Sequence, residues 1–507
     1  MPGRFSKGLI AVLAGLMAGQ PVYAANGYSE LPDIGTPANT IITPQEEAQL
    51  GAMVLKQITD ADQLLQDPEV DEYIQGIGDR LASHAQEGPR RFTFHVVKDP
   101  SINAFAIPGG YVFVNAGLIL STSSESELAG VMAHEISHVT QRHTARQIQS
   151  QMHASLIATA AMLAAILIGA MAHSSDAGLA GVMSAQSAAM QHQLNYSREA
   201  EYEADRVGIG VMAAAGFDPN AMASMFETMG RIYRSAGPNA KLIEFLQNHP
   251  LTSDRVAEAR ARAATYPPVR PVDTVGYLLT RQRLRVLTTM GPGDDPREMY
   301  ADAAAGETGT ADYRYYGYAI ALIQSNRPAA AVPVLRRLVA QHPDVIEYYT
   351  ALGQAQLANN DLGASRIVLE RALELFPRNV PVTIRYAQTL MRAGDNKQAH
   401  AVLLDLFNVV PPTPSQVQLI AQAANSAGET AEAYYYIAEG HVMDGDLPAA
   451  INTLRIALST PNITPMQRSR FQARIDELKE YLPPRAQAAI DRGEPAPPGR
   501  NPNVRSN

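Results

Sequence analysis

The sequence predicts a mainly α-helical protein, in which a helical domain with a small β-sheet is followed by an α-solenoid of short repeats. Apolar residues recur at helical spacing over residues 46–90 and again from Glu125, whereas residues 91–120 alternate in the manner of β-strands. Beyond residue 310, turn residues recur every 34 residues, which is the period of helix–turn–helix repeats. A chain of 507 residues is long enough for both regions, at roughly 100–200 residues per domain.

Composition excludes several classes of function. The 41 Lys and Arg residues are outnumbered by 50 Asp and Glu residues. The net charge of −9 argues against a nucleic-acid-binding protein, which needs cationic surface to displace counterions from phosphate. The chain has no cysteine, so disulfides, thiolate metal sites and cysteine nucleophiles are excluded. Any metal site must therefore be built from histidine and carboxylate side chains.

The first 24 residues have the features of a secretory signal peptide. Arg4 and Lys7 form a basic segment, an apolar run follows at Leu9–Gly19, and Val22–Ala24 forms the cleavage site. The apolar run is short for a transmembrane anchor, so we expect cleavage and export. A protein without thiols suits the oxidising periplasm, which is the predicted location. Residues 25–45 would then form an N-terminal extension.

Residues 46–265 are expected to form the first folded domain. Helical patterns at 46–90 lead into strands at Phe92–Val97 and within Ala104–Val114, and the turn signal Pro108-Gly109-Gly110 interrupts the second of these stretches. Helical periodicity returns at Glu125 and continues through the residues that carry the chemistry.

An uncharged stretch lies inside this domain at residues 154–172. Its length is at the lower limit for a transmembrane helix, and it lacks the Lys, Arg and aromatic anchors of a membrane span. Two interpretations fit, a buried or membrane-touching helix and a true span. The first, together with the small apolar residues at 177–190, would give peripheral membrane contact through residues 154–190.

Residues 266–310 are expected to link this domain to the repeats through a helix near Leu278–Leu287. Tetratricopeptide repeats are predicted over 311–482, because small residues recur where the helices cross and turn residues recur between them. The recurring turn residues are Asn326, Asn360, Gly394 and Gly428, and Pro343, Pro377 and Pro411 stand at the ends of helical runs.

Three departures from the repeat pattern are also predicted. Pro333 lies inside a predicted helix, which we expect it to distort. The spacing halves between Gly428 and Gly445, so we expect helices to stack singly from there to a capping helix at 467–481. Residues 483–507 are rich in Pro, Arg and Asn and are expected to form a disordered tail.

The segment His134-Glu135-Ile136-Ser137-His138 is typical of a metallopeptidase. On a helix, His134 and His138 lie one turn apart on the same face, so both imidazoles can bind one metal ion. Glu135 projects beside them, toward a metal-bound water molecule, where it can act as a general base.

A catalytic zinc ion needs a third protein ligand, for which Glu201 is the candidate. It lies in a carboxylate-rich helical pattern at residues 196–205. Asp205 is one turn further on the same face, where it could accept the outer N–H of a ligand histidine and fix its tautomer. Glu203, like Glu199, falls on another face and is expected to be a solvated surface acid, and His143 is likewise expected at the surface.

Three motifs in this order resemble the HtpX-like family of gluzincin zinc peptidases. They are the segment Asn103–Asn115, the His-Glu-x-x-His helix, and the Ser-Arg-x-x-Glu-x-x-Ala-Asp helix that ends at Asp205. The resemblance covers roughly residues 46–265, and it implies one Zn²⁺ per chain with Glu135 as the catalytic residue. It implies as zinc ligands His134, His138 and Glu201. It also implies an edge strand, on which an extended substrate adds by β-augmentation, formed by Asn103, Ala104, Phe105 and Ala106.

The resemblance gives His249 a regulatory role. It lies in a His-Pro dipeptide, which is stiff and extended because proline restricts the residue before it. In similar proteins the matching histidine can take the fourth zinc position and close the site. The residue that stabilises the oxyanion stays open among His249, Arg255 and Tyr196.

These features predict a periplasmic zinc endopeptidase with chaperone activity. The signal peptide and repeats narrow the resemblance to exported members that act in the assembly and quality control of outer-membrane β-barrel proteins. The implied partners of the repeats are unfolded or stalled β-barrel proteins and the outer-membrane assembly machinery. One alternative is a repeat-based chaperone or scaffold with a latent metal site, although a scaffold has no use for the general base Glu135. The other is an integral-membrane protease that spans at 154–172.

Overall fold

The structure is a computed structural model and describes residues 43–85, 91–144, 197–236, 245–270, 272–482 and 484–492. Several predicted features lie outside these residues. They are the signal peptide at 1–24, the N-terminal extension as far as residue 42, the apolar segments within 154–190, Tyr196, and the tail after residue 492. Within the described ranges, no helix combines the length and the apolar character that crossing a membrane requires.

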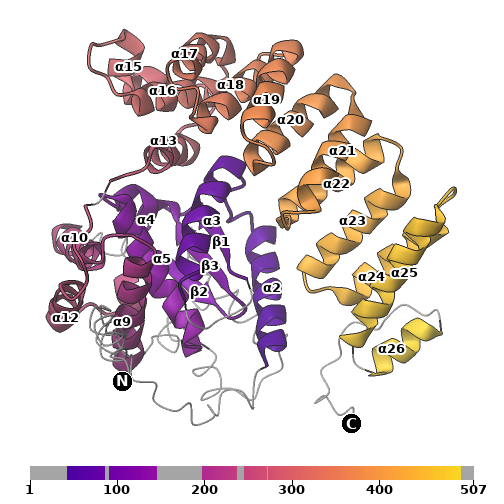
Figure 1. Ribbon diagram of the computed structural model, residues 1–507, viewed down its shortest axis with the longest axis horizontal. Helices are drawn as coiled ribbons and strands as arrows, with labels where there is room; N and C mark the ends of the chain where they lie inside the picture. Colours follow the sequence, from indigo (N-terminus) through magenta and orange to yellow (C-terminus); the bar gives the residue numbers. More distant parts are fainter. Residues whose placement is uncertain are drawn as a thin grey trace, which may run out of the picture. The chain divides into compact units, whose positions relative to one another are not determined.

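A three-stranded sheet forms the centre of the first domain (Figure 1). Its strands are β1 (Thr93–Val97), β2 (Ala104–Ile107) and β3 (Tyr111–Asn115), in the order β1-β3-β2. β3 runs parallel to β1 and antiparallel to β2. The predicted turn joins β2 to β3, and Gly109 and Gly110 adopt there the positive φ angles, 90° and 88°, that glycine permits. β2 therefore stands at one edge of the sheet.

Helices pack on both faces of this sheet. α2 (Pro44–Asp60) covers the face that carries Phe113. α3 (Pro68–Ala82) and α5 (Glu125–Thr140) pack on the opposite face, which carries Val112 and belongs to the main core. The other helices of the domain are α4 (Ala116–Ser121), α9 (Arg198–Ala214), α10 (Asn220–Ala236), α11 (Phe245–Asn248) and α12 (Ser253–Ala263).

The helix predicted in the linker is confirmed as α13 (Val275–Thr289), and the short helices α14 (Pro296–Met299) and α15 (Ala301–Ala305) follow it. The repeat region then consists of helices that pack on one another in chain order (Figure 1). These are α16 (Asp312–Gln324), α17 (Pro328–Gln341), α18 (Ile346–Ala358), α19 (Leu362–Leu375), α20 (Val380–Ala393), α21 (Asn396–Phe407), α22 (Pro414–Ser426), α23 (Thr430–Met443), α24 (Leu447–Ser459) and α25 (Pro465–Glu480).

The predicted turn residues share one backbone conformation. Asn326, Asn360, Gly394 and Gly428 each lie between the two helices of a pair, at φ angles of 59°, 60°, 87° and 83°. This left-handed region is open to glycine and, among other residues, favours asparagine, because a β-carbon crowds the following carbonyl group. The recurrence of these two residue types is thus a direct consequence of helix termination.

The prediction that helices stack singly after Gly428 is wrong. The helices α24 and α25 form a fifth pair, and the turn between them contains Asn462 at a φ angle of 62°. Asn462 lies 34 residues after Gly428, so the period continues unbroken. Gly445 also has a positive φ angle, 75°, but it lies between two pairs, which produced the apparent halving.

Two further predictions need correction. Helix α17 is continuous through Pro333, which lies inside it, five residues after its first residue Pro328. The predicted disordered tail begins with a helix, α26 (Pro484–Asp491), whose buried residues Ala486, Ala489 and Ile490 recur at helical spacing. Its backbone is tied to the last repeats, because Arg455 donates a hydrogen bond to the Ile490 carbonyl oxygen.

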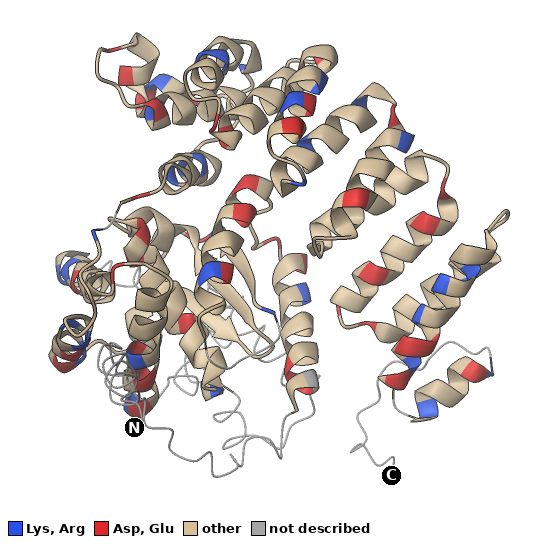
Figure 2. Ribbon diagram, in the orientation of Figure 1, with Lys and Arg blue, Asp and Glu red and all other residues tan. Residues whose placement is uncertain are grey.

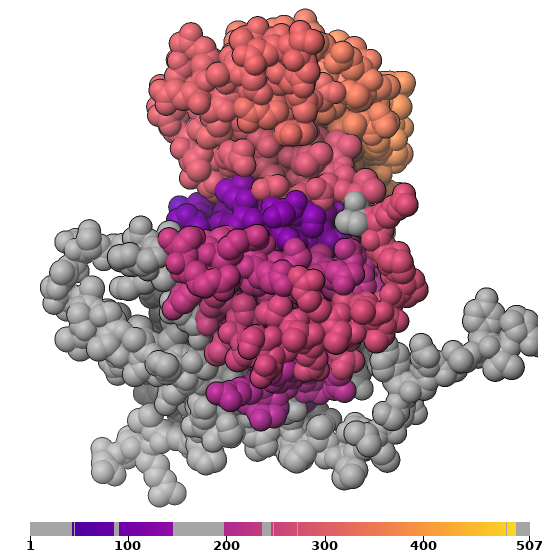
Figure 3. All heavy atoms as spheres, turned by 90° about the vertical axis from the view of Figure 1, so that its left-hand side faces the viewer, coloured from indigo at the N-terminus to yellow at the C-terminus, as the bar shows by residue number. Residues whose placement is uncertain are grey.

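A buried ionic cluster joins the repeats to the first domain. Arg283 of α13 donates to both carboxylate oxygens of Asp67, at 2.6 and 2.7 Å, and Arg385 of α20 donates to both oxygens of Glu69, at 2.9 and 2.6 Å. In Figure 3 the indigo segment lies between the magenta helices of the first domain and the red first repeats. Figure 2 shows acidic and basic residues interspersed along the repeat helices, as in the exposed pair Arg371–Glu374.

Candidate metal centre

Helix α5 presents the predicted histidines to the interior. Its first turn is capped by Ser124, whose hydroxyl accepts a hydrogen bond from the Glu127 amide at 3.2 Å. His134, Glu135 and His138 are fully buried within the helix. A polar group in such a place is stable only with a partner, so the burial itself indicates a ligand-binding or catalytic role.

Helix α9 brings the carboxylates to α5. Ser197 caps it through a hydrogen bond from the Ala200 amide, and Glu201 and Asp205 face inward, both buried. The two helices approach closely at Gly208, where a β-carbon would lie 3.2 Å from the Ala133 carbonyl oxygen. Glycine at this position allows the approach that sets Glu201 beside the histidines.

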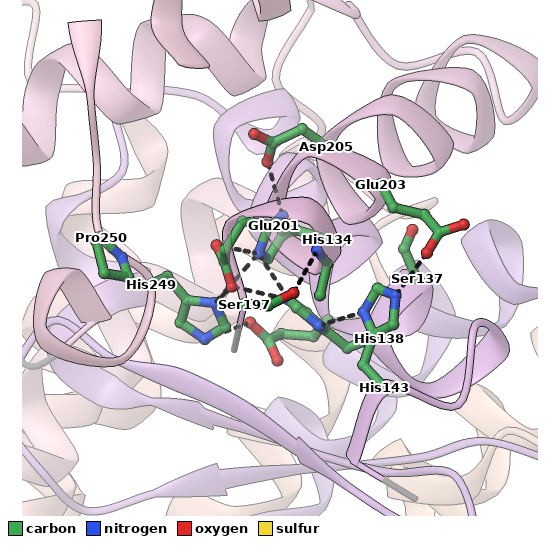
Figure 4. Close-up of polar contacts among 12 residues, drawn as sticks. His134, Ser137, His138, His143, Ser197, Glu201, Glu203, Asp205, His249 and Pro250 are labelled. Carbon is green, nitrogen blue, oxygen red and sulfur yellow. Dashed lines mark hydrogen bonds and ion pairs between the residues drawn. The ribbon is translucent and has the colours of Figure 1, made fainter. Parts of the chain in front are cut away.

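Four donor atoms converge in the space between these helices (Figure 4). Nε2 of His134 lies 3.0 Å from Nε2 of His138 and 3.6 Å from Oε2 of Glu201. Nδ1 of His249 lies 3.3 Å from Nε2 of His134 and 2.9 Å from Oε1 of Glu201. Donors about 2.0–2.1 Å from a tetrahedral ion are roughly 3.3–3.4 Å apart, so this set fits a zinc-sized cation.

His249 reaches the cluster from the segment between α11 and α12. Its ring is buried and stacks on Phe245, with the ring centroids 4.5 Å apart. The Phe245 amide donates to the Ile102 carbonyl oxygen at 3.1 Å, next to the edge strand. The histidine segment is therefore attached to the chain that leads into β2.

Glu135 stands beside the cluster without joining it. Among the described residues neither of its carboxylate oxygens has a hydrogen-bond partner, and Oε1 lies 3.5 Å from Nε2 of His249. Burial raises the pKa of Glu135, against weaker opposing effects of His249, His134 and the backbone amide of Ala106. A buried carboxylate with a raised pKa suits a general base.

Asp205 and Arg255 contact residues that supply donor atoms to the cluster. Oδ1 of Asp205 lies 2.9 Å from Nδ1 of His134, on the side of the ring away from the cluster. Arg255 donates to both oxygens of Asp205 at 2.8 Å and lies 2.7 Å from Oε2 of Glu201. Burial would raise the pKa of Asp205, but hydrogen bonds with His134 and Arg255 outweigh it and lower the value. Arg255, one of the candidates for stabilising the oxyanion, thus forms ion pairs with two acids.

The contacts of two residues near the cluster, His143 and Glu203, were not predicted from the sequence. His143, predicted at the surface, is buried. Its Nδ1 lies 2.8 Å from Nδ1 of His138, and its Nε2 lies 3.0 Å from Oε2 of Glu203 (Figure 4). Helical spacing gave no signal for this contact, because His143 follows the helix and the chain turns at Arg142 with a φ angle of 54°.

The predicted edge strand lies next to the cluster. β2 packs on α5, the helix that carries His134 and His138. Within the described residues β3 is the strand that pairs with β2, so β2 is an edge strand of the sheet. Phe105 points to the opposite face, where it stacks on Phe113 with the ring centroids 4.8 Å apart.

Comparisons with known proteins give a consistent result. Residues 68–263 match the model of Peptidase family M48, and residues 316–380 and 356–423 match models of the tetratricopeptide repeat. The Beta-barrel assembly-enhancing protease of Escherichia coli is 31% identical over 94% of this chain and 97% of its own length. A Vibrio cholerae protein provisionally given the same name is 34% identical over 90% of this chain and 94% of its own length. The Mitochondrial metalloendopeptidase OMA1 of Schizosaccharomyces pombe is 32% identical over 36% of this chain and 50% of its own length.

Proposed function

This chain is a metallopeptidase that belongs to the family of the beta-barrel assembly-enhancing proteases, and we propose that it is a periplasmic zinc endopeptidase for outer-membrane β-barrel proteins. The proposed chemistry rests on the convergence of His134, His138 and Glu201 beside the buried carboxylate of Glu135. The names of the relatives support the role with outer-membrane β-barrel proteins. The signal-peptide features of residues 1–24 support the periplasmic location.

The donor set favours zinc. Two imidazoles and one carboxylate in a chain without cysteine are the ligands of a catalytic zinc site, and they leave one position for water. When bound there, zinc would polarise a scissile carbonyl group and lower the pKa of a water molecule to about 7. Glu135 would accept a proton from the attacking water molecule and return it to the leaving amine, for which its raised pKa is suited.

The edge strand is the proposed substrate-binding element. An extended peptide that adds to β2 would lie over α5, and backbone pairing would hold it without selecting particular side chains. Asn103, Ala104, Phe105 and Ala106 would supply this edge. A weak demand on side chains suits an enzyme whose substrates share only an unfolded state.

His249 is the proposed fourth ligand of the resting enzyme. Its Nδ1 is part of the donor cluster, so it would compete with water for the metal. This contact also supports the second candidate function, a repeat-based chaperone with a latent metal site. The endopeptidase and the latent chaperone differ in whether the segment that holds His249 moves away from the metal when a client protein binds.

The substitution Glu135→Gln tests the proposed activity. It should lower the cleavage of casein by about 10²–10⁴-fold, because general acid–base catalysis contributes that much, while the metal content stays at one per chain. Glu199→Gln, in the first turn of α9, is the matched control and should cleave normally. Wild-type cleavage by Glu135→Gln would contradict the mechanism, and a wild type that cleaves no substrate would favour the chaperone.

His249→Ala distinguishes between two roles of His249, a fourth metal ligand that blocks the site and a catalytic group. We expect the variant to keep its metal, because three ligands remain, and to show higher cleavage without a client protein. The measurement is basal casein cleavage together with metal content. A loss of activity with metal retained would make His249 a transition-state stabiliser instead.

A further inference from the structure

We propose that His143 and Glu203 form a relay that fixes the orientation of the metal ligand His138, an inference that rests on the metal centre of the proposed function. His143 is then a positioning residue, since it contacts the ligand and stands outside the four residues that form the donor cluster. The proposal gives a role to two side chains that the catalytic mechanism does not use.

The hydrogen bonds of His138 define the direction of the relay. Its Nε2 belongs to the donor cluster, 3.0 Å from Nε2 of His134, so this nitrogen must be unprotonated to bind a cation. The ring proton is then on Nδ1, which lies 2.8 Å from Nδ1 of His143. His143 accepts this proton's hydrogen bond at Nδ1 and carries its own proton on Nε2, 3.0 Å from Oε2 of Glu203. Each ring is therefore held in one tautomer from both sides.

The backbone after α5 is shaped for this contact. Helix α5 ends at Thr140, and Arg142 adopts a φ angle of 54°, in the left-handed region. For a residue other than glycine this conformation costs about 1–2 kcal/mol, so other interactions must hold it. Arg142 donates to Oε1 of Glu47 in α2, with Nη2 at 2.6 Å and Nε at 3.1 Å. The turn places the His143 ring edge-on to His138, with the ring centroids 4.9 Å apart.

One turn of α9 serves both ligand histidines. Glu201 supplies a donor atom, and Asp205, one turn later, lies 2.9 Å from Nδ1 of His134. Glu203 lies between these two residues and reaches His138 through His143. The first histidine is thus supported directly by an acid and the second through an intervening imidazole. Outer partners of this kind commonly change metal affinity about 10–100-fold.

The test measures metal binding. His143→Phe keeps a ring of similar size but removes both hydrogen bonds, and we expect zinc affinity, measured by competition with a chelator, to fall about 10–100-fold. Glu203→Gln should cause a smaller loss, because the amide oxygen can still accept from Nε2 of His143. The double variant should bind no more weakly than His143→Phe, since both act through one chain of bonds. Glu199→Gln is the control and should bind as the wild type does.

A spectroscopic measurement distinguishes positioning from packing. With cobalt(II) in place of zinc, the visible bands of His143→Phe should shift, because the orientation of His138 changes, whereas those of Glu199→Gln should not. A folded His143→Phe variant with wild-type zinc affinity and an unchanged cobalt spectrum would overturn the relay. If His143→Phe does not fold, a Glu203→Gln variant with wild-type zinc affinity and an unchanged cobalt spectrum would overturn it equally. Zinc binding that depends on His143 in a protein without proteolytic activity would instead contradict the proposed function and leave the relay intact.

Discussion

The repeat region and the metal centre are built from contacts of opposite kinds. Each repeat helix packs mainly on its neighbours in the chain, as α22 does on α21 and α23. The metal centre draws its groups from four separated segments, 102–106, 134–143, 201–205 and 245–255. A local pattern is therefore enough to specify a repeat, whereas the metal centre exists only after distant segments have come together.

The buried ionic cluster is the place where the two regions depend on each other. It contains Asp67 and Glu69 at the start of α3, Arg283 of the linker helix and Arg385 of the third repeat. Arg283 also contacts Gln354 of α18 at 3.1 Å. If the repeats were stabilised by local contacts alone, a change in this cluster would leave their unfolding unaffected.

The largest expected effect on stability follows from Arg283→Met. The variant removes the closest counter-ion of the buried Asp67, which keeps only Arg385 at 3.6 Å, and one of the two partners of Glu69, and this should lower the free energy of unfolding by about 3–5 kcal/mol. Urea unfolding followed by circular dichroism measures this. We also expect the single transition to separate into two, because the link between the regions is weakened.

An exposed ion pair of the repeats provides the control. Arg371→Met removes the pair with Glu374, whose side chains are 61% and 68% exposed, and it should cost well under 1 kcal/mol. Equal losses from the two variants would mean that the cluster contributes no more than a surface pair. A single transition in Arg283→Met would mean that the remaining contacts, which include the pair of Arg385 with Glu69, are enough to couple the regions.

The same contrast explains what the sequence could predict. Turn residues, helix pairs and the His134–His138 spacing depend on residues a few positions apart, and they were predicted. The contacts of Arg255 with Asp205 and of His143 with Glu203 depend on the approach of separate helices, so neither was found. Even within the repeats the prediction failed after Gly428, because Gly445 has the same left-handed conformation as the turns inside the pairs. A glycine or asparagine alone does not distinguish a turn within a pair from a turn between pairs, whereas the 34-residue spacing from Gly428 to Asn462 does.

A second prediction concerns pH and the first domain. His95 of β1 has a buried Nε2 without a hydrogen-bond partner among the described residues, and burial lowers its pKa to about 4. The histidine stays neutral in the folded protein, whereas the unfolded chain takes up a proton near its ordinary pKa. The stability that this group contributes is therefore fully present above about pH 6.5 and is lost as the pH falls toward 4.

His95→Phe should remove this dependence. We expect the wild type to lose about 1–3 kcal/mol between pH 6.5 and pH 4 through this residue, and the variant to show a correspondingly flatter curve. Urea unfolding at a series of pH values is the measurement, and His84→Gln, at an exposed position, is the control. An unchanged slope in His95→Phe would mean that other groups carry the pH dependence of the first domain.

The smallest expected effect concerns two glycines of the repeats. It tests whether the 34-residue pattern of turn residues follows from their backbone conformation. Gly394 ends α20 at a φ angle of 87°, and Gly363 lies in the first turn of α19 with no positive φ. A β-carbon at either position would meet no atom within 4 Å, so the two sites differ in backbone conformation and not in space. Gly394→Ala should destabilise the repeats by about 1 kcal/mol, because alanine is strained in the left-handed region. Gly363→Ala should stabilise them by up to about 1 kcal/mol, because alanine is the better helix former. Opposite signs in thermal unfolding would support the conformational origin of the 34-residue pattern, and a loss of stability in both variants would contradict it.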